Sequence, residues 1–201
     1  MAERRKHNTD GRIARGERTR EAIVEAHTAL LQDGVLKPTG KLIAERADIS
    51  LRTLWSNFKD LEALLVQTSR HWLDSDAALG VVIDPGGPLP ERIDLFCTMR
   101  ARRWEHLAPA ARSAALGEPF SAALRRSRAE HVARVHADLE TVFAREIAAA
   151  GQRGELLRTA LFVAASWPSW SSMRDDLELD VETATSVVRS TLTALLVPSG
   201  R

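Results

Sequence analysis

The chain has 201 residues, a formal net charge of +1 and one cysteine, Cys97. A single cysteine excludes an intrachain disulfide and suits a reducing compartment, and no apolar run is long enough to cross a membrane or to act as a signal peptide. We therefore expect a cytoplasmic protein with no membrane partner, long enough to bury a substantial core in one or two domains.

The apolar periodicity predicts an all-α fold. Proline and glycine fall mostly between long stretches rich in Ala, Leu, Arg and Glu, and no run alternates β-branched residues as a strand would. Charge is uneven: residues 1–60 carry 12 Lys and Arg against 9 Asp and Glu, whereas the rest of the chain carries 16 against 18. The basic excess therefore lies in the N-terminal part.

The first fifteen residues are basic and lack apolar periodicity. Such a segment is either a solvated, disordered tail or, beside a DNA-reading unit, an arm that neutralises phosphates or enters a minor groove. Both interpretations stay open. Residues 16–33 then show apolar positions at helical spacing, and Gly34 is a typical helix terminator.

The segment 39–59, TGKLIAERADISLRTLWSNFK, predicts two short helices joined by a tight turn. Thr39 can cap a first helix over about 40–47, because its hydroxyl can accept a hydrogen bond from an unpaired N–H of the first turn. Ser50 can cap a second helix over 51–57 in the same way. The two helices would follow helix 16–33 in a three-helix module.

Asp48 falls at the turn, where a short polar side chain tolerates left-handed backbone geometry. In the second helix, apolar side chains recur at a spacing of three and four residues, at Leu51, Leu54 and Phe58. The polar residues between them would face outward. A helix of this kind can lie in a major groove, where Arg and Asn make bidentate hydrogen bonds to base edges.

This segment resembles the helix-turn-helix of TetR-family transcriptional regulators. Their pattern is a threonine-capped helix, I-A-x-x-A, a turn, a serine, T-L-aromatic and a phenylalanine. The matching residues are Thr39, Ile43, Ala44, Ala47, Ser50, Thr53, Leu54, Trp55 and Phe58. Asp48 replaces the usual turn glycine, Trp55 the usual Tyr or Phe, and Leu61 a lysine that holds a DNA phosphate in the family, a role that Lys59 can take.

The candidate DNA-binding residues lie at the two caps, along the second helix and in its flanks. They are Thr39, Lys41, Ser50, Leu51, Arg52, Thr53, Trp55, Ser56, Asn57 and Lys59. The alternative is a helical hairpin that only packs, in which Ser50 and Thr53 serve as caps. Packing alone leaves Arg52 without a structural role.

The rest of the chain predicts further helices separated by proline and glycine. A loop is expected at 84–90, where the sequence is DPGGPLP. Helices are expected over about 60–78, from Pro90 or Glu91 to about 107, near 109–116, and over 119–150, 154–167 and 181–197.

The helices over 154–167 and 181–197 are more apolar than a small bundle needs, which suggests a subunit interface. In TetR-family proteins the last two long helices pair with their copies, and the resemblance implies the same here. The candidate interface residues are Leu157, Leu161, Ala164, Val188, Leu192 and Leu195.

Bulky side chains in the C-terminal part suit an apolar or planar effector with few hydrogen-bonding groups. The candidate ligand-binding residues are Trp72, Phe96, Met99, Arg100, Trp104, Phe120, His131, Val135 and Trp167. Ordinary core packing is the alternative for each of them. Arg100 is unusual on an apolar stripe, because an unpaired buried charge is costly. It is expected at an exposed edge, paired with a carboxylate, or beside a ligand's acidic or carbonyl group.

Together these patterns predict a DNA-binding domain at residues 1–59 and an effector-binding and dimerisation domain at residues 60–201. We expect a homodimeric regulator, a repressor of a near-palindromic operator in double-stranded DNA, released by a small, largely apolar ligand. The alternative is a DNA-binding protein without such an effector, controlled by a protein partner. No HExxH, Gly-rich phosphate loop or G-x-S-x-G elbow is present, so neither an enzyme nor a cofactor or metal site is expected.

Overall fold

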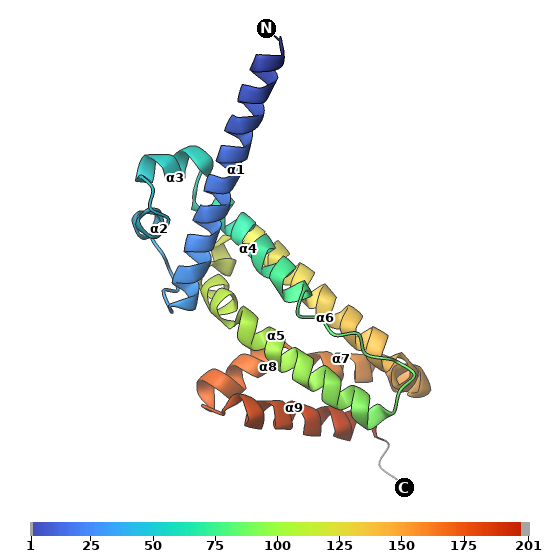
Figure 1. Ribbon diagram of the computed structural model, residues 1–201. Helices are drawn as coiled ribbons and strands as arrows, with labels where there is room; N and C mark the ends of the chain where they lie inside the picture. Colours follow the sequence, from blue (N-terminus) through green and yellow to red (C-terminus); the bar gives the residue numbers. More distant parts are fainter. Residues whose placement is uncertain (1, 198–201) are drawn as a thin grey trace. The chain divides into compact units, whose positions relative to one another are not determined.

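The computed structural model describes residues 2–197, with side chains from residue 14 onward, and these residues form helices without any strand. The all-α prediction is confirmed (Figure 1). The α-helices are α1 (Ala2–Gln32), α2 (Gly40–Arg46), α3 (Leu51–Asn57), α4 (Leu61–Ala77), α5 (Leu89–Gly117), α6 (Ala122–Ala149), α7 (Gly154–Ala164), α8 (Trp167–Ser171) and α9 (Val181–Leu196). Short 3-10 turns at Glu118–Phe120 and Gly151–Arg153 and a π turn at Ser172–Asp176 lie between them.

The chain divides into two compact units. The first unit contains residues up to 74 together with 109–127, and the second contains 75–108 together with the residues from 128 onward. Helices α4, α5 and α6 each contribute residues to both units. The division of the chain at residue 60 into a DNA-binding and an effector domain stays a prediction.

The first unit is built on a core shared by α1, α2, α3 and the start of α4. Its apolar side chains are buried almost completely, and burial of each contributes on the order of 2 kcal/mol of transfer free energy. The core residues are Ile23, Val24, Leu30, Ile43, Ala44, Leu54, Phe58 and Leu64. This core fixes the three-helix module that the sequence predicts.

Helix α1 begins at Ala2, much earlier than the predicted start at residue 16, so its backbone includes most of the segment for which a disordered tail was one interpretation. Its end agrees with the prediction. Gly34 has φ of 86°, its N–H donates to the Leu31 carbonyl, and the N–H of Val35 donates to the Leu30 carbonyl. This pair of bonds is a Schellman motif, which favours glycine at the left-handed position.

Two predicted helix boundaries in the middle of the chain were wrong. Helix α5 runs through Pro109 without a break, although a separate short helix was expected there. Proline removes a single N–H bond, and the two apolar side chains just before it, Leu107 and Ala108, are buried and hold the helix in place. Helix α6 begins at Ala122 instead of 119, because Ser121 caps it by accepting a hydrogen bond from the N–H of Leu124 at 3.0 Å.

The second unit packs α7 and α9 against α5 and α6. Phe143 has φ of −118° and ψ of 20°, which interrupts α6, and its ring meets that of Phe96 edge-on at 5.3 Å. Large buried apolar side chains of this unit include Phe96, Trp104, Leu139, Phe143, Leu161 and Leu192. They come from all four helices, so this core depends on residues far apart in the sequence.

His27 lies in the first unit, buried on α1, with its Nδ1 3.0 Å from the hydroxyl of Thr68 on α4. Burial lowers the pKa of His27 to about 4. The unfolded chain therefore binds a proton at His27 near pH 6.5, whereas the folded chain does not until about pH 4. Because the unfolded state binds more protons in this window, the contribution of His27 to stability falls as the pH drops.

We expect a His27→Gln variant to lose about 2 kcal/mol less of its unfolding free energy than the wild type between pH 7 and pH 5. Denaturant unfolding of the full chain at the two pH values measures this difference. His71→Gln, at an exposed position of α4, is the matched control. An equal pH dependence for all three proteins would show that His27 is not the titrating group.

Candidate functional site

The two short helices α2 and α3 have the capping that the sequence predicts. The N–H of Leu42 donates to the Thr39 hydroxyl at 3.3 Å, and the N–H of Thr53 donates to the Ser50 hydroxyl at 3.0 Å. Each cap satisfies one backbone donor that a seven-residue helix would otherwise leave unpaired. Both helices are therefore fixed at their start by their own sequence.

The turn between these helices depends on Asp48. Its φ is 52°, a left-handed conformation that Asp adopts more readily than most residues other than glycine. The N–H of Ile49 donates to the Ala44 carbonyl at 3.0 Å, which closes the turn. The prediction that Asp48 takes the left-handed turn position usually held by glycine is thus confirmed.

Helix α3 presents only part of the outward row that was predicted. Arg52 is exposed, and so is Leu51, whose side chain is 44% exposed although its spacing suggested an inward position. The side chains of Ser56 and Asn57 both donate to the backbone carbonyl of Thr53, each at 2.8 Å. In this conformation they are turned back onto the helix.

Trp55 is 40% exposed, and its remaining surface packs on the start of α2. A methyl group at Gly40 would collide with the Trp55 indole, so only glycine fits opposite this ring. Trp55 therefore has a structural role in joining α2 to α3 and still leaves an edge of its indole free. The sequence resemblance did not predict this use of Gly40.

Arg20 is a residue that the sequence analysis missed. Its guanidinium lies over the Phe58 ring, 4.4 Å from the ring centroid, and donates to the backbone carbonyl of Asn57. This contact places a cation from α1 at the C-terminal end of α3, where it interacts favourably with the negative end of the helix dipole. The sequence around Arg20 contains no motif that indicates this role, because the contact joins residues 37 positions apart.

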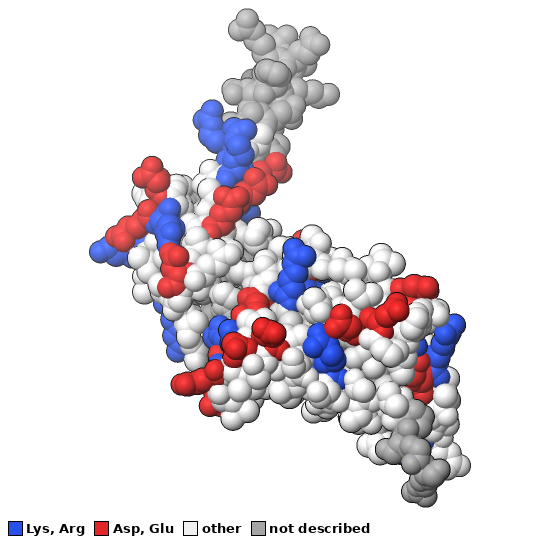
Figure 2. Space-filling model, turned by 60° about the horizontal axis from the view of Figure 1, so that its bottom comes forward, with Lys and Arg blue, Asp and Glu red and all other residues white. Residues whose placement is uncertain are grey.

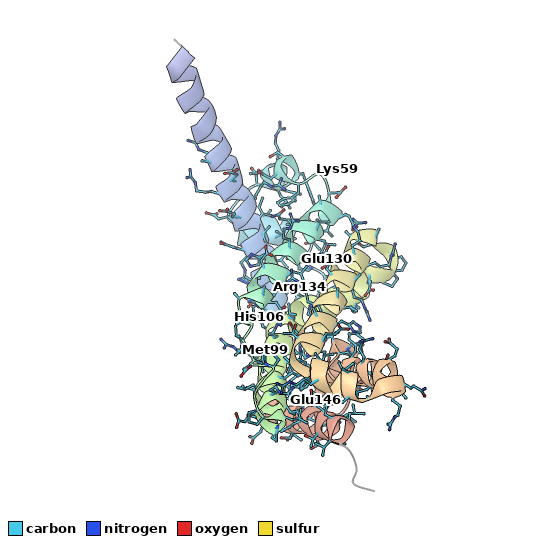
Figure 3. All side chains as sticks on the ribbon, turned by 90° about the vertical axis from the view of Figure 1, so that its right-hand side faces the viewer. Lys59, Met99, His106, Glu130, Arg134 and Glu146 are labelled. Atoms are coloured by element: carbon cyan, nitrogen blue, oxygen red, sulfur yellow. The ribbon has the colours of Figure 1, made fainter. Side chains whose placement is uncertain are left out.

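The charges around the module differ in how they are used. Lys41 lies 3.8 Å from Glu45, and Arg46 pairs with Asp33. Lys59, in the exposed connection between α3 and α4 (Figure 3), and Arg52 form no ion pair with any residue from 14 to 197. Basic and acidic side chains are interspersed on the face that Figure 2 shows. Arg52 lies on α3 and Lys59 two residues beyond its end, so these are the cations that α3 itself presents.

The second unit contains the predicted ligand-binding residues Phe96, Met99, Arg100, Trp104, His131, Val135 and Trp167, whereas Trp72 and Phe120 belong to the first unit. Phe120 is 91% exposed, so its ring lines no enclosed site in that unit. The remaining seven come from α5, α6 and the start of α8. Of these, Arg100, Trp104, His131 and Trp167 form a group in contact.

Arg100 belongs to an ion cluster formed by three buried residues, Asp76, Arg100 and Arg103, and the partly exposed Asp138. Arg103 donates to both carboxylate oxygens of Asp76, at 2.8 and 2.5 Å, and to Asp138 at 2.8 Å. Arg100 donates to the same Asp138 oxygen at 2.5 Å. Burial and, second, the charge of Arg103 lower the pKa of Arg100, while the hydrogen bond to Asp76 raises the pKa of Arg103.

The aromatic rings next to this cluster contact one another. The Trp104 ring lies 4.8 Å from the His131 ring and 5.7 Å from the Trp167 ring, between centroids. The indole N–H of Trp104 donates to the Ala165 carbonyl at 3.1 Å. Trp104 is therefore fixed in place. Burial lowers the pKa of His131 to about 4, so its ring is neutral at neutral pH.

A separate cleft of about 330 Å³ in the second unit lies between the end of α6 and α7, and none of the predicted ligand-binding residues lines it. Its polar residues are already engaged with one another: Arg158 lies 2.8 Å from Glu140 and pairs with Glu155. The cleft is open and its charges are paired. It is a weaker candidate for an effector than the aromatic group.

The predicted interface residues divide between the interior and the surface of the second unit. Leu161, Val188 and Leu192 are buried within a single chain, Leu157 and Ala164 are partly buried, and Leu195 is exposed. The exposed apolar side chains of α7 and α9 are instead Leu156, Val163, Val181, Val187 and Leu195. Dimerisation through these helices stays a prediction. The exposed apolar side chains include Leu156, Val163 and Val187, each one residue before a predicted interface residue, together with the predicted Leu195.

Cys97 is buried, and burial raises the pKa of its thiol to about 12, which leaves it protonated. No group of three or more His, Cys, Asp or Glu residues in the described part of the chain could hold a metal ion. None of the helices described here has the length and apolar composition to span a membrane.

The fold has a counterpart among solved structures. It is similar to a transcriptional regulator from Rhodococcus sp. Rha1, with a TM-score of 0.65, 15% sequence identity, and coverage of 90% of this chain and 95% of that chain. No protein-family model matches the sequence, and no curated protein matches it either. At this identity the likeness shows a shared all-helical fold over nearly the whole length of both chains.

Proposed function

We propose that this protein is a DNA-binding transcriptional regulator of the TetR type, and that α3 is its recognition helix. The observation that carries the proposal is the capped pair α2 and α3, joined at the left-handed Asp48, with Arg52 exposed on α3 and without an ion pair among residues 14–197. Neither the exposed arginine nor the exposed Leu51 contributes to the core. The fold shared with a solved transcriptional regulator agrees with this assignment.

Each exposed group suits a different part of the DNA. Arg52 can make a bidentate contact with guanine in the major groove, and Leu51 can contact a thymine methyl group. Lys59, just beyond the end of α3, can hold a phosphate, as can Thr39 and Lys41 at the start of α2. Ser56 and Asn57 would have to leave the Thr53 carbonyl before they could contact a base edge.

We further propose that the protein acts as a homodimer and as a repressor released by a small, largely apolar ligand bound in the second unit. Leu156 and Val163 lie seven residues apart on α7, and Val187 and Leu195 lie eight apart on α9, so each pair forms one exposed stripe. A dimer would place two copies of α3 roughly 34–36 Å apart, as a near-palindromic operator requires.

The function is tested directly by a gel shift with the DNA that flanks the protein's own gene, across a salt series. Saturable binding that survives competitor DNA supports a sequence-specific regulator. Binding that is equal on all sequences and disappears with salt would contradict the proposal, because phosphate contacts alone give that behaviour.

Substitution of Arg52 separates base recognition from phosphate binding. We expect Arg52→Ala to weaken operator binding by about tenfold or more and to relax the preference for one base pair. Lys59→Ala should weaken binding to all sequences and reduce the salt slope by about one. Arg102→Ala, at an exposed position of α5 in the second unit, is the control for loss of a positive charge. Unchanged operator affinity in both test variants would show that α3 is not the recognition helix.

A second substitution tests the dimer face. We expect the double variant Leu156→Glu, Val163→Glu to sediment as a folded monomer in analytical ultracentrifugation, because two charges would be buried at the interface. Leu177→Glu, at an exposed residue after the π turn, is the control and should remain a dimer. A dimer that survives the double change would place the interface elsewhere.

A further inference from the structure

Arg100 has two hydrogen-bond donors that nothing in the described chain satisfies. Its side chain is 2% exposed and its Nη2 donates to Asp138, but Nε and Nη1 are buried without an acceptor among residues 14–197. His131 Nε2 is buried without a partner in the same way. Buried polar atoms of a native protein nearly always have a partner, and the cost of leaving one without is large. These three atoms therefore point to a group that the chain itself does not supply.

The missing group is an acceptor and not a negative charge. The two guanidinium groups of the ion cluster are already balanced by the carboxylates of Asp76 and Asp138. His131 is neutral at neutral pH. A carboxylate ligand would bring a third negative charge close to Asp138, which is unfavourable in a buried site. An uncharged oxygen acceptor leaves the balance intact.

The surroundings of these atoms are flat and aromatic. The Arg100 guanidinium carbon lies 5.5 Å from the Phe96 ring and 5.6 Å from the Trp104 ring. Trp104 in turn contacts the rings of His131 and Trp167. Trp167 is only partly buried, unlike Trp104 and Phe96, so a ligand would enter past this ring.

We propose that Arg100 and His131 are the polar anchor of a small-molecule site in the second unit, which binds a flat, uncharged aromatic compound through a ketone-type carbonyl oxygen. Arg100 donates to that oxygen, the Nε2–H tautomer of His131 donates a second hydrogen bond, and the ring system lies against the partly buried indole of Trp167. The regulatory meaning of this site rests on the proposed function, but binding to the site does not.

Three naphthalene compounds of similar shape test the proposal by titration calorimetry on the full chain without DNA. They are 2-acetylnaphthalene, with a neutral carbonyl, 2-naphthoate, with a carboxylate, and 2-ethylnaphthalene, with no acceptor. We expect the ketone to bind about tenfold tighter than the other two, since one buried hydrogen bond to a charged donor is worth roughly that factor. Equal affinity for the ketone and the ethyl compound, or no saturable binding of the ketone, would overturn the proposal.

A matched pair of histidine variants tests the anchor itself. His131→Phe keeps a ring beside Trp104 but removes Nε2, and should reduce the preference for the ketone several-fold, because only the Arg100 hydrogen bond remains. His136→Phe is the control, because His136 lies on the same helix but stacks on Phe162 at 4.1 Å, away from the anchor. A ketone preference that is unchanged in His131→Phe would assign the unpartnered atoms to internal water and overturn the site. Tighter binding of 2-naphthoate than of the ketone would overturn the uncharged class.

These outcomes are distinct from failure of the proposed function. Ketone binding that depends on His131, in a protein that shifts no DNA, leaves the site standing and removes its regulatory role. Release of a DNA complex by 2-acetylnaphthalene in the wild type, but not in His131→Phe, would connect the site to regulation. Ligand and DNA would then be coupled through their different affinities for two states of the protein.

Discussion

The second unit depends on the ion cluster of Asp76, Arg100, Arg103 and Asp138. Asp76 is fully buried on α4, the two arginines lie on α5, and Asp138 lies on α6. The charges of Asp76, Arg100 and Arg103 are tolerated in the interior only while their partners remain, because loss of one buried partner leaves another charge without compensation, at a cost of about 3–5 kcal/mol. The cluster thus joins the second-unit parts of α4, α5 and α6 through ion pairs. Contacts between apolar side chains alone would allow these helices to pack in more than one relative position.

This arrangement limits how an effector can act. A ligand at Arg100 would contact a member of the cluster, and every helix that the cluster joins continues into residues of the first unit. A ligand shifts a conformational equilibrium only by its difference in affinity for the two states, and a 100-fold loss of operator affinity requires about 2.7 kcal/mol of coupling. One or two buried hydrogen bonds that form in a single state supply a free energy of this size. No long chain of side-chain movements is needed for such an effect.

The parts of the structure that the sequence predicted well are those specified by neighbouring residues. Thr39, Ser50 and Gly34 act within four or five residues of themselves, so their caps and turns follow from local chemistry. The ion cluster could not be predicted, because Arg103 meets Asp76 across 27 residues and Arg100 meets Asp138 across 38. Pro109 misled for the opposite reason: a local rule for ending helices was overridden by the burial of the two residues before it. For Leu192 the apolar stripe was recognised, but the pattern cannot distinguish burial within one chain from burial against a copy.

Arg92 and Arg100 show what separates a structural charge from one that points to a ligand. Both are buried on α5, eight residues apart, and the sequence gives no reason to treat them differently. Arg92 donates to the carbonyls of Gly87 and Val142 and to both oxygens of Glu146, and this pairing raises the pKa of Arg92 and lowers that of Glu146. All three of its nitrogens are used, so it needs nothing further. Arg100 uses one nitrogen of three and lies among aromatic rings. Unsatisfied donors in an aromatic setting, and not burial or charge alone, are therefore the feature on which the proposed binding site rests.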